Sequence, residues 1–105
     1  MKHKVKFKEW SCIVEFARYP RQFGGRLAMV LKEERTGAPV VTCTVNIPEW
    51  QGASDEVLIK NWSENEGVLY ALVEAKVLLP TGGRVRVGFV SASVCRLLIP
   101  VPAGV

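Results

Sequence analysis

The chain has 105 residues, of which 49% are hydrophobic and 23% charged, and its formal net charge is +4 at pH 7. These averages are typical of globular chains, so they exclude a disordered or fibrous class, and the length suits one domain with its own core. No window approaches the roughly 18 apolar residues of a membrane helix, and the first residues lack the apolar core of a signal peptide. We therefore expect a cytoplasmic protein without a membrane partner.

The charges are unevenly distributed along the chain. Residues 1–35 carry nine Lys/Arg and four Asp/Glu, residues 49–66 carry five acids and one lysine, and residues 76–105 carry four bases and no acid. A basic excess attracts polyanions or an acidic protein surface. The acidic middle segment argues against a chain built uniformly to coat nucleic acid.

The first half of the chain predicts antiparallel strands joined by short connections. Apolar residues alternate with basic or polar ones, the period-2 pattern of a half-buried strand, and a turn at residues 9–11 makes the opening a hairpin. Residues 20–25 and 36–39 contain Pro and Gly and predict a loop and a turn. The predicted strands are 2–7, 12–19, 27–34 and 40–47.

The second half predicts one helix and a return to strand. Residues 57–62 suit either a short fifth strand or an extended lead-in. Val68, Leu69, Leu72, Val73 and Lys76 then follow the i, i+3, i+4 spacing of one helical face. Residues 81–83 stop that pattern, and residues 85–99 read as strand interrupted at Gly88.

The predicted architecture is a single α+β domain over residues 1–99, followed by a loose tail over residues 100–105. Sequential strands with short connections favour a meander. We therefore expect a four- to five-stranded antiparallel sheet with one helix packed across it.

The polar stretch NWSENEG, residues 61–67, precedes the predicted helix. Ser63 and Glu66 fit the capping box S-x-x-E, and Glu64 would also be favoured by the helix dipole. Trp62 would cover the seam between helix and sheet. The competing interpretation is a catalytic pair of Glu64 and Glu66, but two residues at that spacing diverge by about 200° around a helix. The sequence favours a helix cap over a catalytic site.

Enzyme signatures are scarce. His3 is the only histidine, and Cys12, Cys43 and Cys95 are scattered among apolar neighbours, which predicts buried reduced thiols rather than a zinc site or a nucleophile. The run GGRVRVG, residues 82–88, lacks the Lys-Ser/Thr of a phosphate loop, so a hairpin turn accounts for it better. We expect no catalytic residue, no metal and no cofactor.

Two basic features are the strongest candidates for binding. Lys4, Lys6 and Lys8 would share one strand face, and the loop FARYPRQFGGR interleaves arginines with aromatic residues. Such a mixture can neutralise phosphates and stack on bases. The alternative is an ordinary solvated face whose lysines discourage aggregation at a sheet edge.

Several residues together resemble a known pattern: K-x-W-S-E-N-E-G, then T-G-R, then G-F-V and V-C. Here the pattern spans mainly residues 40–97, with Gly83 inserted before Arg84 and with Arg86 near a usual turn position. The chain in this respect resembles a small uncharacterised family, a domain of unknown function found on bacterial plasmids, conjugative elements and phages. In size and character it is also similar to anti-CRISPR proteins. The resemblance implies a bacterial host cell and a protein partner rather than a reaction.

We therefore expect a non-enzymatic protein-binding module whose partner is a host protein complex, such as a CRISPR effector. The alternative is a nucleic-acid-binding accessory protein that uses the basic strand and loop; a small hydrolase using Glu64 or Glu66 is a third hypothesis. The chain could be a monomer or a homodimer. The residues expected to contact the partner are Lys4, Lys6, Lys8, Arg18, Tyr19, Arg21, Arg26, Trp50, Asp55, Glu56 and Glu64.

Overall fold

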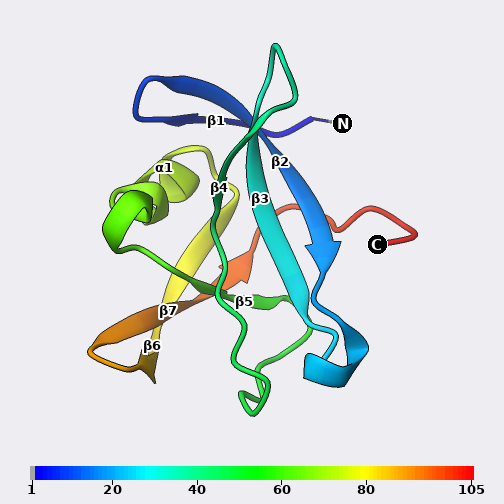
Figure 1. Cartoon of the computed structure of the whole chain (residues 1–105), viewed down its shortest axis with the longest axis vertical. Helices are drawn as coiled ribbons and strands as arrows, with labels where there is room; N and C mark the ends of the chain where they lie inside the picture. The colour runs from blue at the N-terminus through cyan, green and yellow to red at the C-terminus, as the bar shows by residue number, and fades with distance from the viewer. Residues whose placement is uncertain (1) are drawn as a thin grey trace.

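The computed structural model describes residues 2–105 and contains two sheets and one α-helix in that range (Figure 1). The strands are β1 (Lys4–Phe7), β2 (Trp10–Arg18), β3 (Leu27–Glu33), β4 (Pro39–Thr42), β5 (Glu56–Ile59), β6 (Leu78–Val87) and β7 (Val90–Leu97). The helix is α1 (Val68–Glu74), and two 3-10 turns are η1 (Arg21–Phe23) and η2 (Ser63–Asn65). The predicted α+β class is confirmed, although the strands divide between two sheets.

The first sheet is the predicted meander, with the strand order β1-β2-β3-β4 and antiparallel pairing throughout. Its first turn was misplaced, because Phe7 pairs directly with Trp10 and leaves Lys8 and Glu9 as a two-residue loop. Lys8 has φ 53°, the left-handed conformation that tight hairpin turns demand. The register puts Val5 opposite Cys12, both facing the core.

The fourth strand ends at Thr42, earlier than predicted, because the chain then changes its pairing partner. The N–H of Cys43 donates to the carbonyl of Met29 in β3 at 2.8 Å, while the carbonyl of Cys43 accepts from the N–H of Lys60 at 2.8 Å. Val45 continues this pairing by donating to the carbonyl of Leu58. Residues 43–45 therefore join the first sheet to β5, and the ambiguous segment 57–62 begins as a strand.

The second sheet has the order β5-β7-β6 and ends in a long hairpin. The glycines that we expected to form a turn lie instead inside β6, where the register shifts between Pro80 and Arg84. A side chain on Gly83 would come within 3.3 Å of the Val94 side chain, so glycine suits this bulge. The turn itself falls at Gly88 and Phe89, since Val87 pairs with Val90.

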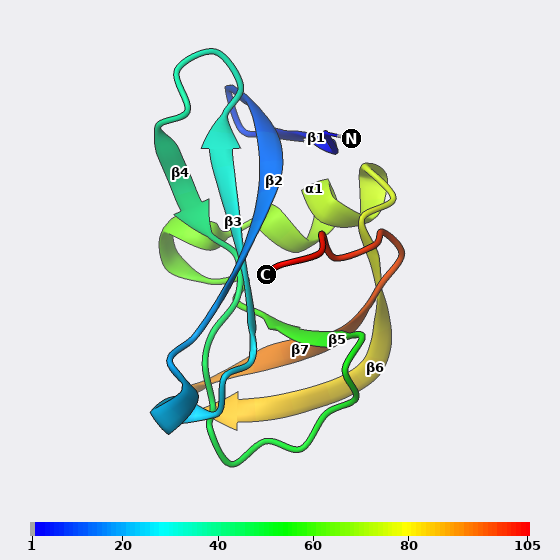
Figure 2. The same cartoon turned by 90° about the vertical axis from the view of Figure 1, so that its right-hand side faces the viewer.

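The main core lies between the two sheets and beneath α1. Met29, Leu31, Ile59, Leu72 and Leu78 are its largest fully buried side chains. In Figure 2, α1 lies between β1 and the second sheet, and it contacts both β1 and β6. The helix thus packs against one strand of each sheet.

The helix is shorter than its apolar pattern suggested. Val68, Ala71 and Leu72 are its buried residues. Lys76 lies beyond its end, with φ 59°, and is exposed rather than laid along the helical face. The chain leaves α1 abruptly and enters β6 at Leu78.

The second sheet is covered on its other face as well. Leu58, Ala92 and Val94 form a small separate cluster there, and the partly buried side chains packed against it include Val45, Ile47, Trp50 and Trp62. Trp62 therefore covers the outer face of this sheet, not the expected helix–sheet seam. The central strand β7 therefore packs on both faces, with Cys95 in the main core and Ala92 and Val94 in the smaller cluster.

The tail that we expected to be loose is partly held in place. Val101 packs against the main core. The side chain of Arg18 donates to the carbonyl of Val105 at 3.4 Å. Both termini are marked in Figure 1.

All three cysteines are free and buried, as predicted. Burial raises the pKa of the Cys43 thiol to about 12 and that of the Cys95 thiol to about 11. Burial also raises the pKa of Cys12, with a smaller contribution from the carboxylate of Glu33 across the strand pair. The thiols stay protonated and inert at neutral pH.

We predict that the free energy of unfolding falls as pH rises above 9. Unfolded thiols ionise near 9.0, whereas folded Cys43 ionises near 12, so its contribution is complete below pH 9 and is lost between those values. The loss should approach about 1.4 kcal/mol per pH unit for one thiol. Urea unfolding at a series of pH values measures it. Cys43→Ala should show a shallower pH dependence, and an unchanged dependence would contradict the prediction.

Candidate functional site

The stretch NWSENEG does not form the capping box that its sequence predicts. Ser63 begins η2 with φ 57°, and its contact with Glu66 is a backbone bond from the Glu66 N–H to the Ser63 carbonyl at 3.0 Å. Because this 3-10 turn occupies residues 63–65, α1 begins only at Val68. Trp62, the N-cap of η2, makes no side-chain cap bond. Gly67, the N-cap of α1, has no side chain with which to make one.

Asn61 caps the helix instead. Its side-chain oxygen Oδ1 accepts from the N–H of Gly67 at 3.2 Å and from the N–H of Leu69 at 3.0 Å. These are two of the backbone donors that a helix start leaves without an intrahelical partner. The asparagine reaches over the 3-10 turn to satisfy them.

Asn65 is the second structural amide in this stretch. Its side chain is almost completely buried, and its Nδ2 donates to the carbonyl of Thr42 at 2.6 Å. This bond ties the start of the helical region to the end of β4. A buried polar group with its partner in place serves stability and register.

Glu64 is fully exposed and interacts with lysines. Its Oε1 lies 3.5 Å from Nζ of Lys60, and Nζ of Lys8 donates to its backbone carbonyl at 3.1 Å. A backbone N–H bond and the Lys60 ammonium lower the pKa of Glu64. A general acid would need a raised pKa, so the environment of Glu64 keeps it ionised.

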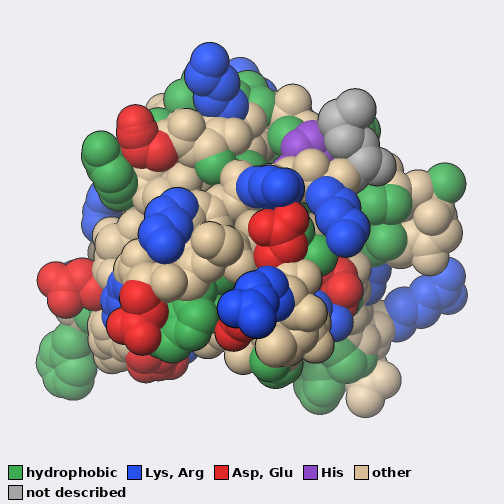
Figure 3. Space-filling model, turned by 90° about the horizontal axis from the view of Figure 1, so that it is seen from above, with side chains coloured by type: hydrophobic (Ala, Val, Ile, Leu, Met, Phe, Trp, Pro, Cys, Tyr) green, Lys and Arg blue, Asp and Glu red, His purple; other side chains and the backbone are tan. Residues whose placement is uncertain are grey.

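The lysines of β1 and its turn lie at one end of the molecule, the upper end in Figure 1, with the β3–β4 turn. Lys4, Lys6 and Lys8 are exposed there, as expected. Acids lie among them, however: Nζ of Lys4 is 3.1 Å from Glu34. Basic and acidic groups alternate over this end in Figure 3. The surface is therefore of mixed charge rather than a basic row.

The predicted basic loop and acidic segment come together at the opposite end. A cleft of about 360 Å³, which we call the lower cleft, is lined by Arg18, Arg26 and Glu56, with residues 24–25 and 52–54 between them. The guanidinium of Arg26 lies 4.6 Å from the centre of the Trp50 ring. It also donates to the carbonyls of Trp50 and Gly52. Arg26 and Trp50 thus form one fixed stack beside the cleft.

The remaining predicted residues divide between surface and scaffold. Arg21 is exposed in η1, and Asp55 is exposed and lies 3.7 Å from Arg96. Tyr19 is half-buried, and its hydroxyl is hydrogen-bonded to that of Thr44 at 2.8 Å. Burial raises the pKa of Tyr19. This bond gives Tyr19 a structural role beside the predicted contact.

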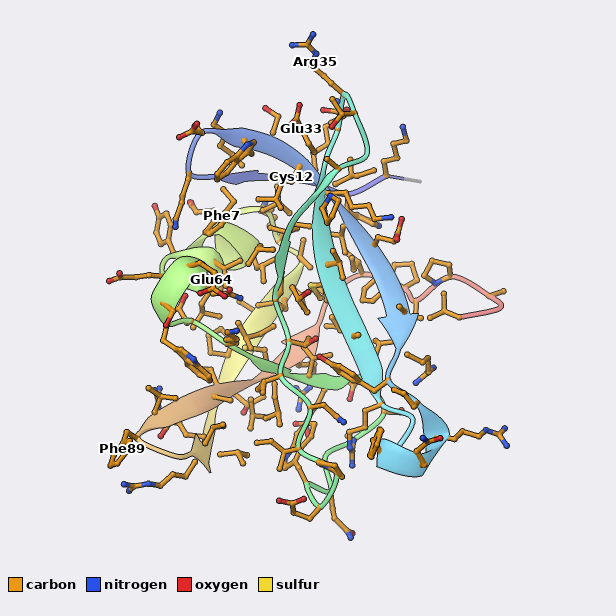
Figure 4. The ribbon with its side chains drawn as sticks, in the orientation of Figure 1. Phe7, Cys12, Glu33, Arg35, Glu64 and Phe89 are labelled. Atoms are coloured by element: carbon orange, nitrogen blue, oxygen red, sulfur yellow. The ribbon has the colours of Figure 1, made fainter. Side chains whose placement is uncertain are left out.

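Sequence reasoning missed a further exposed group, on the hairpin of β6 and β7. Phe89 at its tip is fully exposed, and Arg84 and Arg86 are exposed on β6 (Figure 4). The signal was present in R-V-R-V-G-F-V, where alternation runs into a glycine. Gly88, predicted to interrupt one strand, lies instead in the turn between β6 and β7.

The described residues contain neither a cluster of metal ligands nor a helix that could span a membrane. Between residues 2 and 105, no three His, Cys, Asp or Glu side chains gather closely enough to hold a metal ion. In the same range, no helix has the length and apolar character needed to span a membrane. The lower cleft and the tip of the β6–β7 hairpin each present exposed arginines to solvent.

The Asn61 cap can be tested against the capping box. Asn61→Ala removes the acceptor for two helix N–H groups and should lower the free energy of unfolding by about 0.5–2 kcal/mol. Ser63→Ala, the matched control, should change it by less than about 0.5 kcal/mol, since its side chain caps nothing. Denaturant unfolding measures both. A larger loss from Ser63→Ala would favour the capping box.

The stack beside the lower cleft depends on Gly52. A side chain there would overlap the indole ring of Trp50, so Gly52→Ala should displace the ring and weaken its contact with Arg26. We expect a loss of about 1–3 kcal/mol in unfolding free energy. Ala53→Ser, at the exposed neighbouring position, is the control and should be nearly neutral. Equal stability of the two variants would contradict the packing described.

The comparisons with known proteins add no relative to this picture. No family model, curated protein or solved structure matches the chain. Functional inference therefore rests on the residues of the two surfaces.

Proposed function

We propose that this chain is a non-enzymatic protein-binding module of a mobile genetic element or phage, and that the lower cleft is its contact surface. The observation that supports it is the meeting of two segments far apart in sequence. The basic loop supplies Arg18 and Arg26, and the segment after Trp50 supplies Glu56, while the Trp50 ring stacks on Arg26 beside the cleft.

The composition of this surface suits protein recognition. Arg and Trp are the residue types that most often dominate the binding energy of protein interfaces. Arg26 and Trp50 are already held together by their stacking and by hydrogen bonds to two carbonyls. A group that is ordered before binding loses less conformational entropy on association.

The charges of the lower cleft favour a partner whose surface carries both positively and negatively charged side chains. Arg18 is exposed and Glu56 half-buried at its rim, so a partner must place an acid and a base at matching positions. Such complementarity fixes orientation and rejects wrong partners more than it adds affinity. A purely acidic mimic of nucleic acid would also conflict with the net charge of +4.

The setting of this proposal is taken from the sequence pattern of residues 40–97 alone, which resembles that of proteins of plasmids, conjugative elements and phages and which no family model matches. In that setting the partner is a bacterial host protein complex, such as a CRISPR effector. Binding to the effector would block its action without any chemical step. This part of the proposal rests on analogy rather than on the lower cleft.

Charge reversal in the cleft tests the proposal. The tagged chain should capture a specific protein complex from a bacterial lysate, and it should protect a target plasmid from a CRISPR effector. Arg18→Glu and Glu56→Lys should each reduce both effects about tenfold or more, because each sets a like charge against the partner. Circular dichroism checks that the variants fold.

Arg35→Glu is the matched control. It makes the same charge change as Arg18→Glu at an exposed position in the β3–β4 connection, far from the lower cleft (Figure 4). It should leave capture and protection unchanged. Capture that survives both cleft substitutions, or that falls equally with Arg35→Glu, would contradict the proposed surface.

A further inference from the structure

The hairpin of β6 and β7 ends in an aromatic ring held away from the body of the molecule. Pairing continues to Val87 and Val90, so Gly88 and Phe89 form the turn, with Gly88 at φ 63°. Phe89 is the most exposed large apolar side chain between residues 2 and 105 (Figure 4). A single exposed aromatic side chain is common on protein surfaces. The arginines of the same hairpin, however, indicate a binding role for Phe89.

Two arginines accompany the ring on one side of the hairpin. Arg84 and Arg86 are alternate residues of β6, so they share a face and lie about 6.6 Å apart along the strand. Nε of Arg86 donates to the carbonyl of Gly88 at 3.1 Å, which orients this guanidinium toward the turn. Arg86 therefore lies beside the turn that carries the ring, and Arg84 lies farther from the turn on the same face of β6.

These charges have no counter-charge nearby. Among residues 2–105, no carboxylate lies within 4.0 Å of Arg84 or Arg86, whereas Arg96 lies 3.7 Å from Asp55. The sequence agrees, since residues 76–105 contain no acid. The hairpin tip, residues 84–91, thus carries uncompensated positive charge beside an apolar ring.

The opposite face of the hairpin is fixed to the protein. Val85 and Val87 pack against the cluster of Leu58, Ala92 and Val94. One face is thereby anchored while the arginine face stays exposed to solvent. The tip is presented rigidly, so a ligand need not order it.

A flexible chain with negative charges and flat rings matches this surface. Guanidinium groups bind phosphates, and bases stack on aromatic rings regardless of sequence. In a duplex the bases are already stacked, so Phe89 could reach one only by prising a base step apart. An acidic peptide would match the arginines but offers no flat partner for Phe89.

We propose that the hairpin tip binds single-stranded nucleic acid. Phe89 stacks on one base, and Arg84 and Arg86 contact the neighbouring phosphates. This inference goes beyond protein binding at the lower cleft and uses none of its residues. Failure at one surface would leave the other proposal standing.

Fluorescence anisotropy with a labelled oligothymidine of about 12 nucleotides tests the inference at about 50 mM salt. Two phosphate contacts predict a slope of log K against log salt of about −1.4, and Arg84→Gln and Arg86→Gln should each lower its magnitude by about 0.7. Phe89→Ala should weaken binding about tenfold, while leaving the slope nearly unchanged. The duplex of the same sequence should bind more weakly.

Matched controls separate the hairpin from the rest of the surface. Tyr70→Ala removes another exposed aromatic ring, on α1, and Arg35→Gln removes one charge in the β3–β4 connection. Both should bind like the parent. Three results would overturn the inference: no binding at low salt, equal binding by Phe89→Ala, or equally tight Phe89-dependent binding of polyglutamate, which would assign the tip to acidic peptides.

Discussion

The backbone of Cys43 connects the two halves of this structure. Its N–H pairs with β3 and its carbonyl pairs with the chain just after β5, so one residue belongs to both sheets. Through this junction the meander continues into the second sheet, and the two enclose a common core. The side chain of Cys43 is completely buried in that core, where burial keeps its thiol protonated. Backbone pairing and packing thus converge on the same position.

The polar stretch before the helix reinforces this junction. Asn65 binds the carbonyl of Thr42, the residue directly before Cys43, and Asn61 caps α1 from the chain that leaves β5. The two asparagines of a stretch that resembles an active site in its polar composition therefore stabilise the arrangement of β4, β5 and α1. The polar side chains that remain free for recognition lie on the exposed connections at the two ends of the molecule and on the β6–β7 hairpin. Loops commonly carry binding residues, whereas Asn61 and Asn65 stabilise the fold.

Local patterns predicted what depends on neighbours in sequence. The strands of the first sheet followed from period-2 alternation, and the α+β class from one apolar helical face. The change of pairing partner after Thr42, from β3 to the chain at the end of β5, did not, because it depends on pairing of Cys43 with Lys60 across a long connection. The prediction that Ser63 and Glu66 cap the helix was wrong because a 3-10 turn lies between Trp62 and the start of α1. The spacing of these two residues does not reveal that turn. The Arg26–Trp50 stack joins residues of separate segments, so neither sequence window indicated it.

The order of strands in the second sheet also has a consequence for synthesis. Strand β5 lies beside β7, but residues 60–89 separate them in the chain. As the chain emerges from the ribosome, the meander and the pairing of β5 with residues 43–45 can form before β7 exists, but the other edge of β5 has no partner strand. Long-range pairing of this kind is slow to form and leaves apolar strand exposed meanwhile. The edge of β5 that carries Val57, Leu58 and Ile59 therefore stays unpaired in the nascent chain until β7 has been made.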